Sequence, residues 1–123
     1  MHRGRVDELR PWYDATDAVV VPVFEGSGTR LKLVEAAAHG RPIITTALGA
    51  QGLPLEPDVH YLGAETPAEF VAAIERVAEG AASTAHLVER AREAIAPLMW
   101  SNIAGTLAQR YTELVDARRQ AVP

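Results

Sequence analysis

The stretch GSGTRLKLVEAAAHGRPIITT, residues 26–46, decides the fold that this sequence predicts. Residues 26–28 form a glycine-rich loop, and the pattern that follows predicts a helix over about residues 29–39. Gly40 stands where a left-handed residue commonly ends a helix, and a proline lies just beyond it. Residues 42–46, PIITT, then predict a buried strand. The stretch is therefore a loop, a helix and a strand in succession.

A second apolar strand precedes the glycine loop. Residues 18–23, AVVVPV, form a continuous and largely β-branched run, which is typical of a strand buried on both faces of a parallel sheet. Strand, helix and strand at this spacing predict parallel pairing with a right-handed crossover. A third, short strand is expected at residues 60–63, after a loop over residues 47–59 that contains two glycines and two prolines.

Helices account for most of the remaining sequence. The start at Thr66, Pro67 and Glu69 combines a threonine N-cap, a proline at the first helical position and a capping-box glutamate. The expected helical segments are residues 7–14, 66–79, 83–95 and 101–118. We therefore predict one α/β domain over residues 1–123: a three-layer, Rossmann-like parallel sheet of about three strands with helices.

Three strands make a thin sheet for this class of fold. The first strand is apolar throughout, as a central strand would be, yet nothing earlier in the chain is available to pair beyond it. Either the chain is half of a domain, or another chain supplies the missing edge. An exposed apolar strand is a template for pairing, so we predict self-association through residues 19–23.

Composition narrows the classes of protein. The chain has 123 residues, of which 48% are hydrophobic and none is cysteine. It has no apolar run of the roughly 20 residues that a membrane helix needs, and its first residues lack the apolar stretch of a secretory signal. Without cysteine it forms neither disulfides nor thiolate metal sites, so the cytoplasm is the expected location. The net charge of −4 argues against nucleic-acid binding.

The predicted helix after the glycine loop has a mixed surface. One side of this helix is a polar stripe formed by Lys32, Glu35 and His39. The opposite side is apolar and comprises Leu31, Leu33, Val34, Ala37 and Ala38. Arg30 interrupts this apolar face. Glu35 and His39 lack a third partner for a metal, so no metal site is expected. The aromatic residues Trp12, Tyr13, Trp100 and Tyr111 are expected to be packing anchors.

Arg30 is expected in the first turn of that helix, where its side chain projects past the helix start. Open α/β sheets bind ligands in the crevice at the carboxyl ends of their strands. The free N–H groups of Gly28, Thr29 and Arg30 face the same place, which predicts a phosphate or diphosphate pocket. The alternatives are that Ser27 is only an N-cap in a tight turn, and that Arg30 pairs with Glu25 or is a surface charge.

The segment DAVVVPVFEGSGTRLKLVEAAAHGRPIITTALGAQGL, residues 17–53, resembles the donor-binding part of family 4 (group 1) glycosyltransferases. Residues 4–7 and 58–61 and Trp100 extend the resemblance. It implies the GT-B fold, with this chain forming the latter half of its C-terminal domain. The N-terminal acceptor domain would then be absent. The resemblance also implies that the last helix reaches back to that domain, so that residues 100–111 would cover an interface.

In that family a nucleotide sugar is the donor substrate, and no further cofactor is implied. By resemblance Glu35 binds the ribose hydroxyls, and Gly28 and Thr29 cradle the diphosphate. Arg30 is the candidate that stabilises the departing diphosphate. Gly26, Ser27 and Lys32 complete the expected donor-binding residues. The first glutamate of the family's signature is absent, because Ser27 takes its position and Glu25 lies two residues too early.

The resemblance thus predicts a glycosyltransferase fragment that is inactive alone and needs an N-terminal domain or chain. The alternative is a non-catalytic interaction module that retains the fold.

Overall fold

The computed structural model describes residues 4–121. Its centre is a parallel sheet of three strands, β1 (Val19–Val21), β2 (Ile43–Thr45) and β3 (Leu62–Gly63), in the order β1-β2-β3. Val19 lies opposite Ile43. The predicted three-stranded parallel sheet is confirmed, although each strand is shorter than its sequence pattern indicated.

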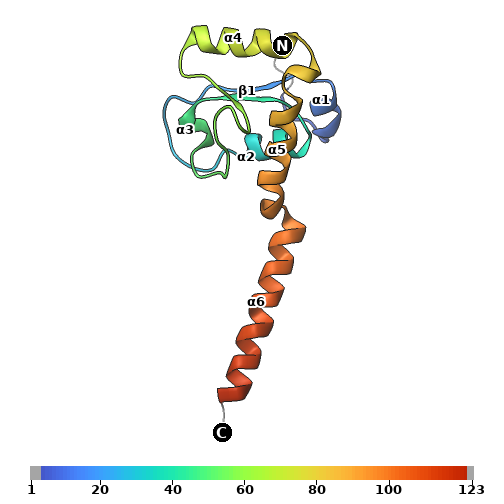
Figure 1. The fold of residues 1–123 in the computed structure, drawn as a ribbon. Helices are drawn as coiled ribbons and strands as arrows, with labels where there is room; N and C mark the ends of the chain where they lie inside the picture. The colour runs from blue at the N-terminus through green and yellow to red at the C-terminus, as the bar shows by residue number, and fades with distance from the viewer. Residues whose placement is uncertain (1–3, 122–123) are drawn as a thin grey trace.

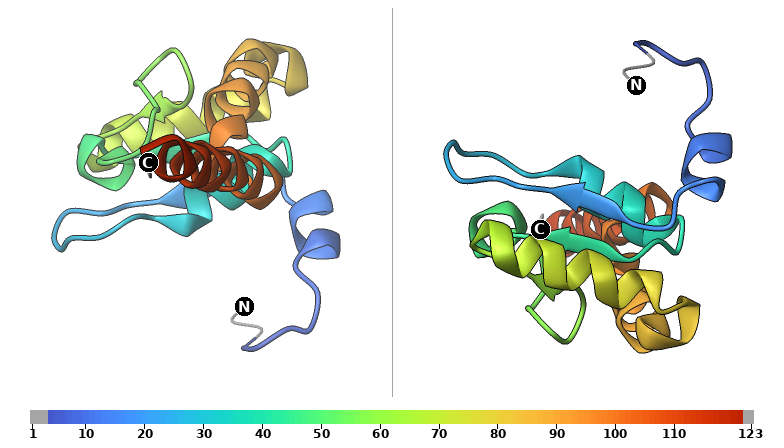
Figure 2. Two further views of the ribbon diagram at one scale, coloured as in Figure 1. Left: turned by 90° about the horizontal axis from the view of Figure 1, so that it is seen from below. Right: turned by 90° about the horizontal axis from the view of Figure 1, so that it is seen from above.

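Helices cover the two faces of this sheet, which gives the predicted three layers (Figure 1). Helices α2 (Leu31–Ala38) and α5 (Ala85–Ile95) pack on one face, and α4 (Pro67–Ala78) packs on the other. Figure 1 shows the strands between α4 and α2, and Figure 2 views these layers from below and from above, with α4 in front of the strands in the view from above. Because successive strand residues point to opposite faces, Ile43 joins the α2 and α5 side of the core and Ile44 joins the α4 side.

The edge strand differs from its prediction. β1 is not buried on both faces, because no described strand lies beyond it and the side chain of Val20 remains 44% exposed. The central strand is β2, whose three residues are all buried. The expectation that β1 lacks a neighbour within this chain holds for residues 4–121, and self-association through it stays a prediction.

Helix α2 begins two residues later than its pattern predicted. Arg30 is its N-cap, with the non-helical angles φ −88° and ψ 84°, and it therefore lies outside the first turn. Leu31 is 66% exposed and Ala38 is also exposed, whereas Ala36 is buried with Leu33 and Ala37. The apolar face is thus rotated from the predicted one, because the helix packs on α5 and the sheet through Leu33, Ala36 and Ala37.

A short helix, α3 (Ala47–Ala50), occupies the start of the segment predicted as the loop 47–59. Thr46 caps it by accepting a hydrogen bond from the Gly49 N–H at 3.0 Å. The cap signal is a threonine directly before a short helical turn. The glycines and prolines that follow it favoured a loop, so the sequence did not predict this helix. The residue at position 49 must be small, because a Cβ there would lie 2.1 Å from the hydroxyl oxygen of Thr45.

The other helical elements agree with the sequence prediction in kind. The capping box of α4 is present, and the backbone N–H groups of Glu65 and Thr66 lower the pKa of Glu69 by hydrogen bonding its carboxylate. The remaining elements are α1 (Arg10–Asp14), η1 (Ala81–Ser83), η2 (Ala96–Leu98) and α6 (Trp100–Ala121). No helix within residues 4–121 has the length and apolar character needed to cross a membrane.

The last helix leaves the body of the molecule and extends away from it (Figure 1). It is 22 residues long, and none of its residues is buried. Trp100 and Tyr111 are 85% and 66% exposed, and Trp12 on α1 is also largely exposed. The prediction of packing anchors within this chain therefore holds only for Tyr13, which is partly buried against the core, and is wrong for Trp12. For Trp100 and Tyr111 the prediction of an interface with an N-terminal domain stays a prediction.

Gly49→Ala should destabilise the fold by about 1–3 kcal/mol, the usual cost of overpacking a filled site. The added Cβ forces the Thr45 hydroxyl away from the Val21 carbonyl, with which it forms a buried 2.8 Å hydrogen bond. Urea denaturation measures the change. The control is Gly105→Ala on α6, where nothing lies within 4 Å of the new Cβ. Equal stability of the two variants would contradict this packing.

Candidate functional site

A hollow of about 210 Å³ opens at the carboxyl edge of the sheet. One wall is the glycine loop, which follows β1 in the chain. The other wall is formed by α3 and the turn after it, which follow β2. The lining residues are Gly26, Ser27, Gly28, Thr29, Arg30, Leu48, Gln51 and Gly52. The glycine loop therefore lies at the crevice where open α/β sheets bind ligands, as the sequence predicted.

Two threonines at the end of β2 hold the segment that leaves β1. The hydroxyl of Thr45 donates to the Val21 carbonyl at 2.8 Å, and that of Thr46 donates to the Val23 carbonyl at 2.5 Å. Thr46 also caps α3, so one side chain connects both walls of the hollow. The sequence pattern indicates these threonines only as strand residues, and no motif in it marks Leu48, Gln51 or Gly52 as part of a site.

The backbone of the glycine loop is open toward solvent. Gly26 and Gly28 have φ values of 100° and 97°, which side chains rarely adopt. Nothing lies within 4 Å of a Cβ placed on Gly28. The loop therefore leaves peptide groups accessible to a ligand that approaches closely, as anion-binding loops do.

Arg30 folds back over this loop. Its Nη1 donates to the Ser27 carbonyl at 2.8 Å, and it forms no ion pair with Glu25 in the described chain. Its Nε is buried and has no hydrogen-bond partner among residues 4–121. A buried donor without a partner costs free energy. The Nε of Arg41, which does not line the hollow, is likewise buried without a partner in the described chain.

Glu35 and Lys32 lie apart from the lining of the hollow. Glu35 accepts a hydrogen bond from the Tyr13 hydroxyl at 3.0 Å, and the Tyr13 ring stacks on His39 with the ring centres 4.5 Å apart. Lys32 is exposed. The polar stripe of α2 is thus partly covered by α1.

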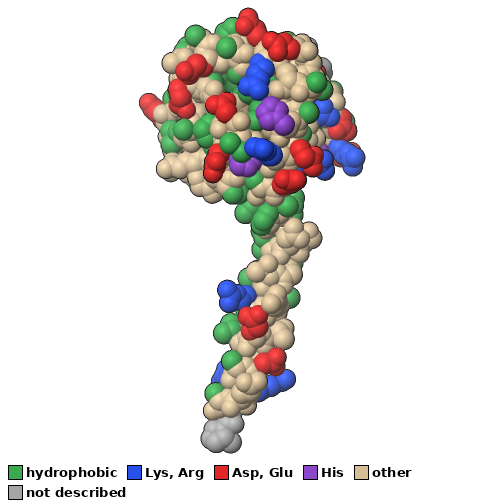
Figure 3. Space-filling model, viewed as in Figure 1, with side chains coloured by type: hydrophobic (Ala, Val, Ile, Leu, Met, Phe, Trp, Pro, Cys, Tyr) green, Lys and Arg blue, Asp and Glu red, His purple; other side chains and the backbone are tan. Residues whose placement is uncertain are grey.

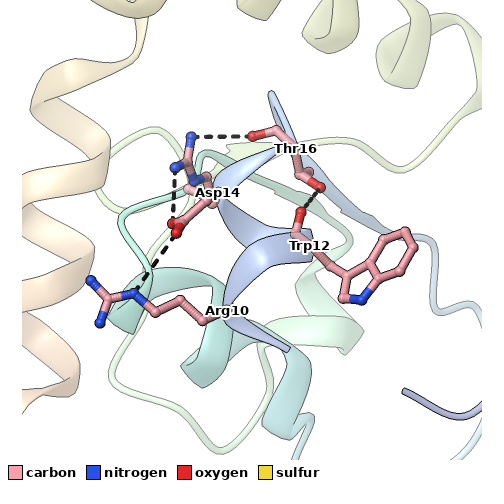
Figure 4. Close-up of polar contacts among 5 residues, drawn as sticks. Arg10, Trp12, Asp14 and Thr16 are labelled. Atoms are coloured by element: carbon pink, nitrogen blue, oxygen red, sulfur yellow. Dashed lines mark hydrogen bonds and ion pairs between the residues drawn. The ribbon is translucent and has the colours of Figure 1, made fainter. Parts of the chain in front are cut away.

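Polar contacts fasten α1, a helix of five residues with none buried. The guanidinium of Arg41 lies 3.6 Å from the Asp14 carboxylate and donates to the Thr16 carbonyl at 3.3 Å. Figure 4 shows Asp14 also facing Arg10, at 3.8 Å, and the Thr16 hydroxyl bonded to the Trp12 carbonyl. These contacts fix the position from which Tyr13 reaches Glu35.

Partial burial raises the pKa of Tyr13 to about 12, and the Glu35 carboxylate adds to this through its hydrogen bond and its negative charge. The phenol therefore keeps its proton at neutral pH and serves as a donor. Only one Glu35 oxygen, Oε2, accepts this hydrogen bond. A carboxylate has further acceptor capacity, which a pair of sugar hydroxyls could use.

A larger hollow of about 490 Å³ adjoins the first and shares Leu48, Gln51 and Gly52 with it. Its remaining lining residues are uncharged and mostly apolar: Ala47, Ala50, Leu53, Leu55, Pro57 and Tyr61. Burial raises the pKa of Tyr61, and the charges of Glu65 and Asp58 raise it further. No cationic side chain lines this larger hollow, whereas Arg30 lines the smaller one. The smaller hollow is therefore the better candidate for binding an anion.

Histidines outside this region have structural or exposed positions. The Nδ1 of His60 accepts from the Glu56 N–H at 2.9 Å, and His86 is exposed on α5. Within residues 4–121 no three histidine, aspartate or glutamate side chains gather as a metal site would require.

Comparison with known proteins identifies the class to which this fold and site belong. The family described as glycosyl transferases group 1 matches residues 2–80, which is more than half of the chain. The chain therefore belongs to the group 1 glycosyltransferases, as the resemblance in residues 17–53 predicted.

The chain is similar to two D-inositol 3-phosphate glycosyltransferases. It is 29% identical to that of Streptomyces coelicolor over 120 residues, and 28% identical to that of Thermobispora bispora over 118 residues. Each match covers 94% of this chain but 26% or 27% of the relative. The chain thus spans about a quarter of the length of these relatives.

A solved structure of sucrose-phosphate synthase from Thermosynechococcus elongatus has a similar fold. The TM-score is 0.68 at 28% sequence identity, over 89% of this chain and 28% of that chain. The match supports the GT-B assignment made from the sequence.

The partial burial of the Tyr13 phenol, together with its hydrogen bond to Glu35, predicts that the fold loses stability at alkaline pH. A folded-state pKa of about 12 against 10.0 for an ordinary tyrosine means that the folded state holds the phenol proton more tightly. This stabilisation is complete below about pH 10 and is lost as the pH rises toward 12. Chemical denaturation across this range should show a shallower decline in the free energy of unfolding for Tyr13→Phe than for the wild type.

Glu35→Gln is the matched variant, because it keeps an acceptor but removes the negative charge that disfavours the tyrosinate. As the pH rises, the free energy of unfolding of Glu35→Gln should fall less steeply than that of the wild type and more steeply than that of Tyr13→Phe. Three identical pH profiles would contradict the contact.

Proposed function

We propose that this chain contributes part of the nucleotide-sugar donor site of a glycosyltransferase that transfers a glycosyl group to an acceptor hydroxyl. By itself the 123-residue chain should transfer no sugar. The observation that carries this proposal is the hollow at the carboxyl edge of β1 and β2, walled by the open glycine loop and Arg30. Since the family implies a nucleotide-sugar donor, the ligand that we expect in this hollow is the diphosphate of that donor.

The diphosphate would occupy the smaller hollow. The accessible peptide groups at Gly26, Ser27, Gly28 and Thr29 are suited to phosphate oxygens, and the dipole of α2 adds positive potential near its start. Arg30 lines the same hollow and has a buried Nε without a partner in the described chain. As the sugar is transferred, negative charge develops on the departing diphosphate, and these groups would stabilise it electrostatically.

Glu35 would bind the ribose. A carboxylate accepts hydrogen bonds from two neighbouring hydroxyls, and Tyr13 orients this one from the side of α1. Lys32 is exposed on the adjoining turn, where its charge would lie near a bound nucleotide. Tyr13 is thus a positioning residue in this proposal.

Further groups must complete such a site. The open edge of β1 would pair with another strand, supplied either by an N-terminal domain or chain or by a second copy. The acceptor would bind outside the region that these residues form. The expected location of the protein is the cytoplasm.

Glu35→Ala should weaken nucleotide binding. Calorimetric titration with UDP, GDP and ADP first identifies the tightest ligand of the wild-type chain. Losing hydrogen bonds to a charged group costs about 1.5–3 kcal/mol, so the dissociation constant should rise by about tenfold or more. The control is Glu89→Ala, which removes an exposed carboxylate on α5 and should change nothing.

Sugar transfer by the wild-type chain alone would refute the claim that it is only part of a site. No binding of any of the three nucleotides by a well-folded chain would instead favour the alternative, an interaction module that has kept the fold.

Arg30→Ala should separate phosphate binding from ribose binding. The substitution should raise the dissociation constant of the nucleoside diphosphate about tenfold, which is the typical cost of losing one charge-assisted hydrogen bond. It should leave the dissociation constant of the unphosphorylated nucleoside unchanged. Glu35→Ala should weaken both ligands. Competition titrations on the two variants measure this, and an equal loss for both ligands in Arg30→Ala would contradict the role of the arginine.

A further inference from the structure

The two hollows at the carboxyl edge of the sheet share part of their lining. Leu48, Gln51 and Gly52 line both the hollow of about 210 Å³ and the hollow of about 490 Å³. The smaller hollow is the proposed site of the diphosphate, and the larger one has no role in that proposal. A pocket of several hundred Å³ beside a ligand site has room for a further group of the same ligand.

A tight turn after α3 forms most of the shared lining. The Leu53 N–H donates a hydrogen bond to the Ala50 carbonyl at 3.1 Å, which closes this turn. Gln51, with φ −55° and ψ 131°, and Gly52, with φ 83°, take the two central positions, and these are the angles of a type II turn. Such a turn needs a residue like glycine at its second central position. Gln51 therefore stands at the corner between the two hollows.

The side chain of Gln51 is available to a ligand. It is exposed, and it forms no hydrogen bond with another residue of the chain that the structure describes. The Arg30 guanidinium, by contrast, already donates to the Ser27 carbonyl. An amide has one carbonyl acceptor and two N–H donors, so Gln51 can accept from one hydroxyl and donate to the next. Neighbouring hydroxyls of this kind are what a sugar ring presents.

The position of Glu35 gives the direction in which a bound nucleotide sugar would run. Glu35 is the proposed ribose ligand, it contacts Tyr13 on α1, and it lies five residues beyond Arg30, which is about 7.5 Å along α2. Figures 1 and 2 show α1 and α3 on opposite sides of the body. A diphosphate carries the nucleoside on one phosphate and the glycosyl group on the other. The glycosyl group would therefore extend from the smaller hollow toward α3.

We propose that the larger hollow receives the transferred glycosyl group, and that Gln51 recognises the hydroxyls of this group and so determines specificity. The inference rests on the proposed function, because it requires the diphosphate in the smaller hollow. It gives a role to the wall opposite the glycine loop, where the family resemblance implied no ligand-binding residue. The glycosyl group is a neutral hexosyl group, without a carboxylate.

The surroundings of the larger hollow favour a neutral sugar over an acidic one. None of the residues that line it is charged, and only Gln51 and Tyr61 among them have polar side chains. Besides burial, the negative charges of Glu65 and Asp58 raise the pKa of Tyr61, so acidic groups act on this hollow from outside its lining. A carboxylate on the sugar would be repelled, whereas the apolar lining suits the C–H face of a neutral ring.

The charge distribution on the surface agrees with this. Figure 3 shows acidic and hydrophobic side chains on the left of the body, which is the side where Figure 1 labels α3. Among the described residues, no lysine or arginine is seen on that part of this face. The cation that lines a hollow here is Arg30, which lines the smaller hollow and is therefore placed for the diphosphate.

Amide resonances of the ¹⁵N-labelled chain test where the sugar binds. UDP is compared with UDP-glucose and UDP-galactose, GDP with GDP-mannose, and ADP with ADP-glucose. In at least one comparison the sugar should add shifts at residues 53, 55 and 61, beyond those that the nucleoside diphosphate produces at residues 26–30 and 51–52. Added shifts confined to the glycine loop in every comparison would overturn the inference and leave the diphosphate site intact.

Gln51→Ala separates sugar binding from diphosphate binding. Loss of neutral hydrogen bonds should raise the dissociation constant of the nucleotide sugar about three- to tenfold and leave that of the nucleoside diphosphate unchanged. Calorimetric titration measures both constants. The matched control is Gln109→Ala, which removes the same side chain from α6 and should change neither constant. An equal change in both constants for Gln51→Ala, or no change in either, would contradict the role of this residue.

The charge of the sugar supplies the last comparison. The wild-type chain should bind UDP-glucuronic acid about fivefold more weakly than UDP-glucose or, where it prefers guanosine, GDP-mannuronic acid more weakly than GDP-mannose by the same factor. Gln51→Arg should reduce this difference, because it places a cation at the corner between the hollows. Equal or tighter binding of the acidic sugar by the wild type would overturn the assignment to a neutral group. A well-folded chain that binds no nucleotide at all would instead refute the proposed function, and this inference with it.

Discussion

The parallel pairing of β1 with β2 is the constraint on which the rest of this structure depends. It brings two carboxyl strand ends to one edge, and the hydroxyls of Thr45 and Thr46 then bind the carbonyls of Val21 and Val23. Two hydroxyls thereby fix the chain that enters the glycine loop. Thr46 also caps α3, so the same side chain sets the opposite wall. The hollow is a direct consequence of this geometry.

Patterns local in sequence predicted the fold well. The β-branched runs, the glycine at the end of α2 and the capping box of α4 are each decided by neighbouring residues, and the structure contains all three elements. The start of α2 and the presence of α3 were missed. The start of α2 depends on tertiary packing, since Leu33, Ala36 and Ala37 select the buried face. Helix α3 has a local threonine cap, but it also needs Gly49, which permits a close approach to Thr45. Propensity yields to packing at such places.

The candidate site divides in the same way. The glycines and Arg30 were identified because loop, helix and strand follow one another directly in the sequence. The contact of Tyr13 with Glu35 joins residues 22 positions apart, so no local pattern indicates it. Trp100 and Tyr111 are exposed, although aromatic residues at helical spacing usually cover a core. The resemblance to the family assigns this part of the last helix to an interface. On α6 the same spacing instead produces a surface that the described chain does not cover.

The central claim is that the edge formed by β1 and β2 receives a diphosphate. The most direct measurement is the change in backbone amide resonances of the ¹⁵N-labelled chain as inorganic pyrophosphate and then a nucleoside diphosphate are added. The account predicts that pyrophosphate shifts the amides of residues 26–30 and 51–52, and that the nucleotide additionally shifts those around Glu35. Shifts confined to other surfaces, or none at either wall of the hollow, would contradict it.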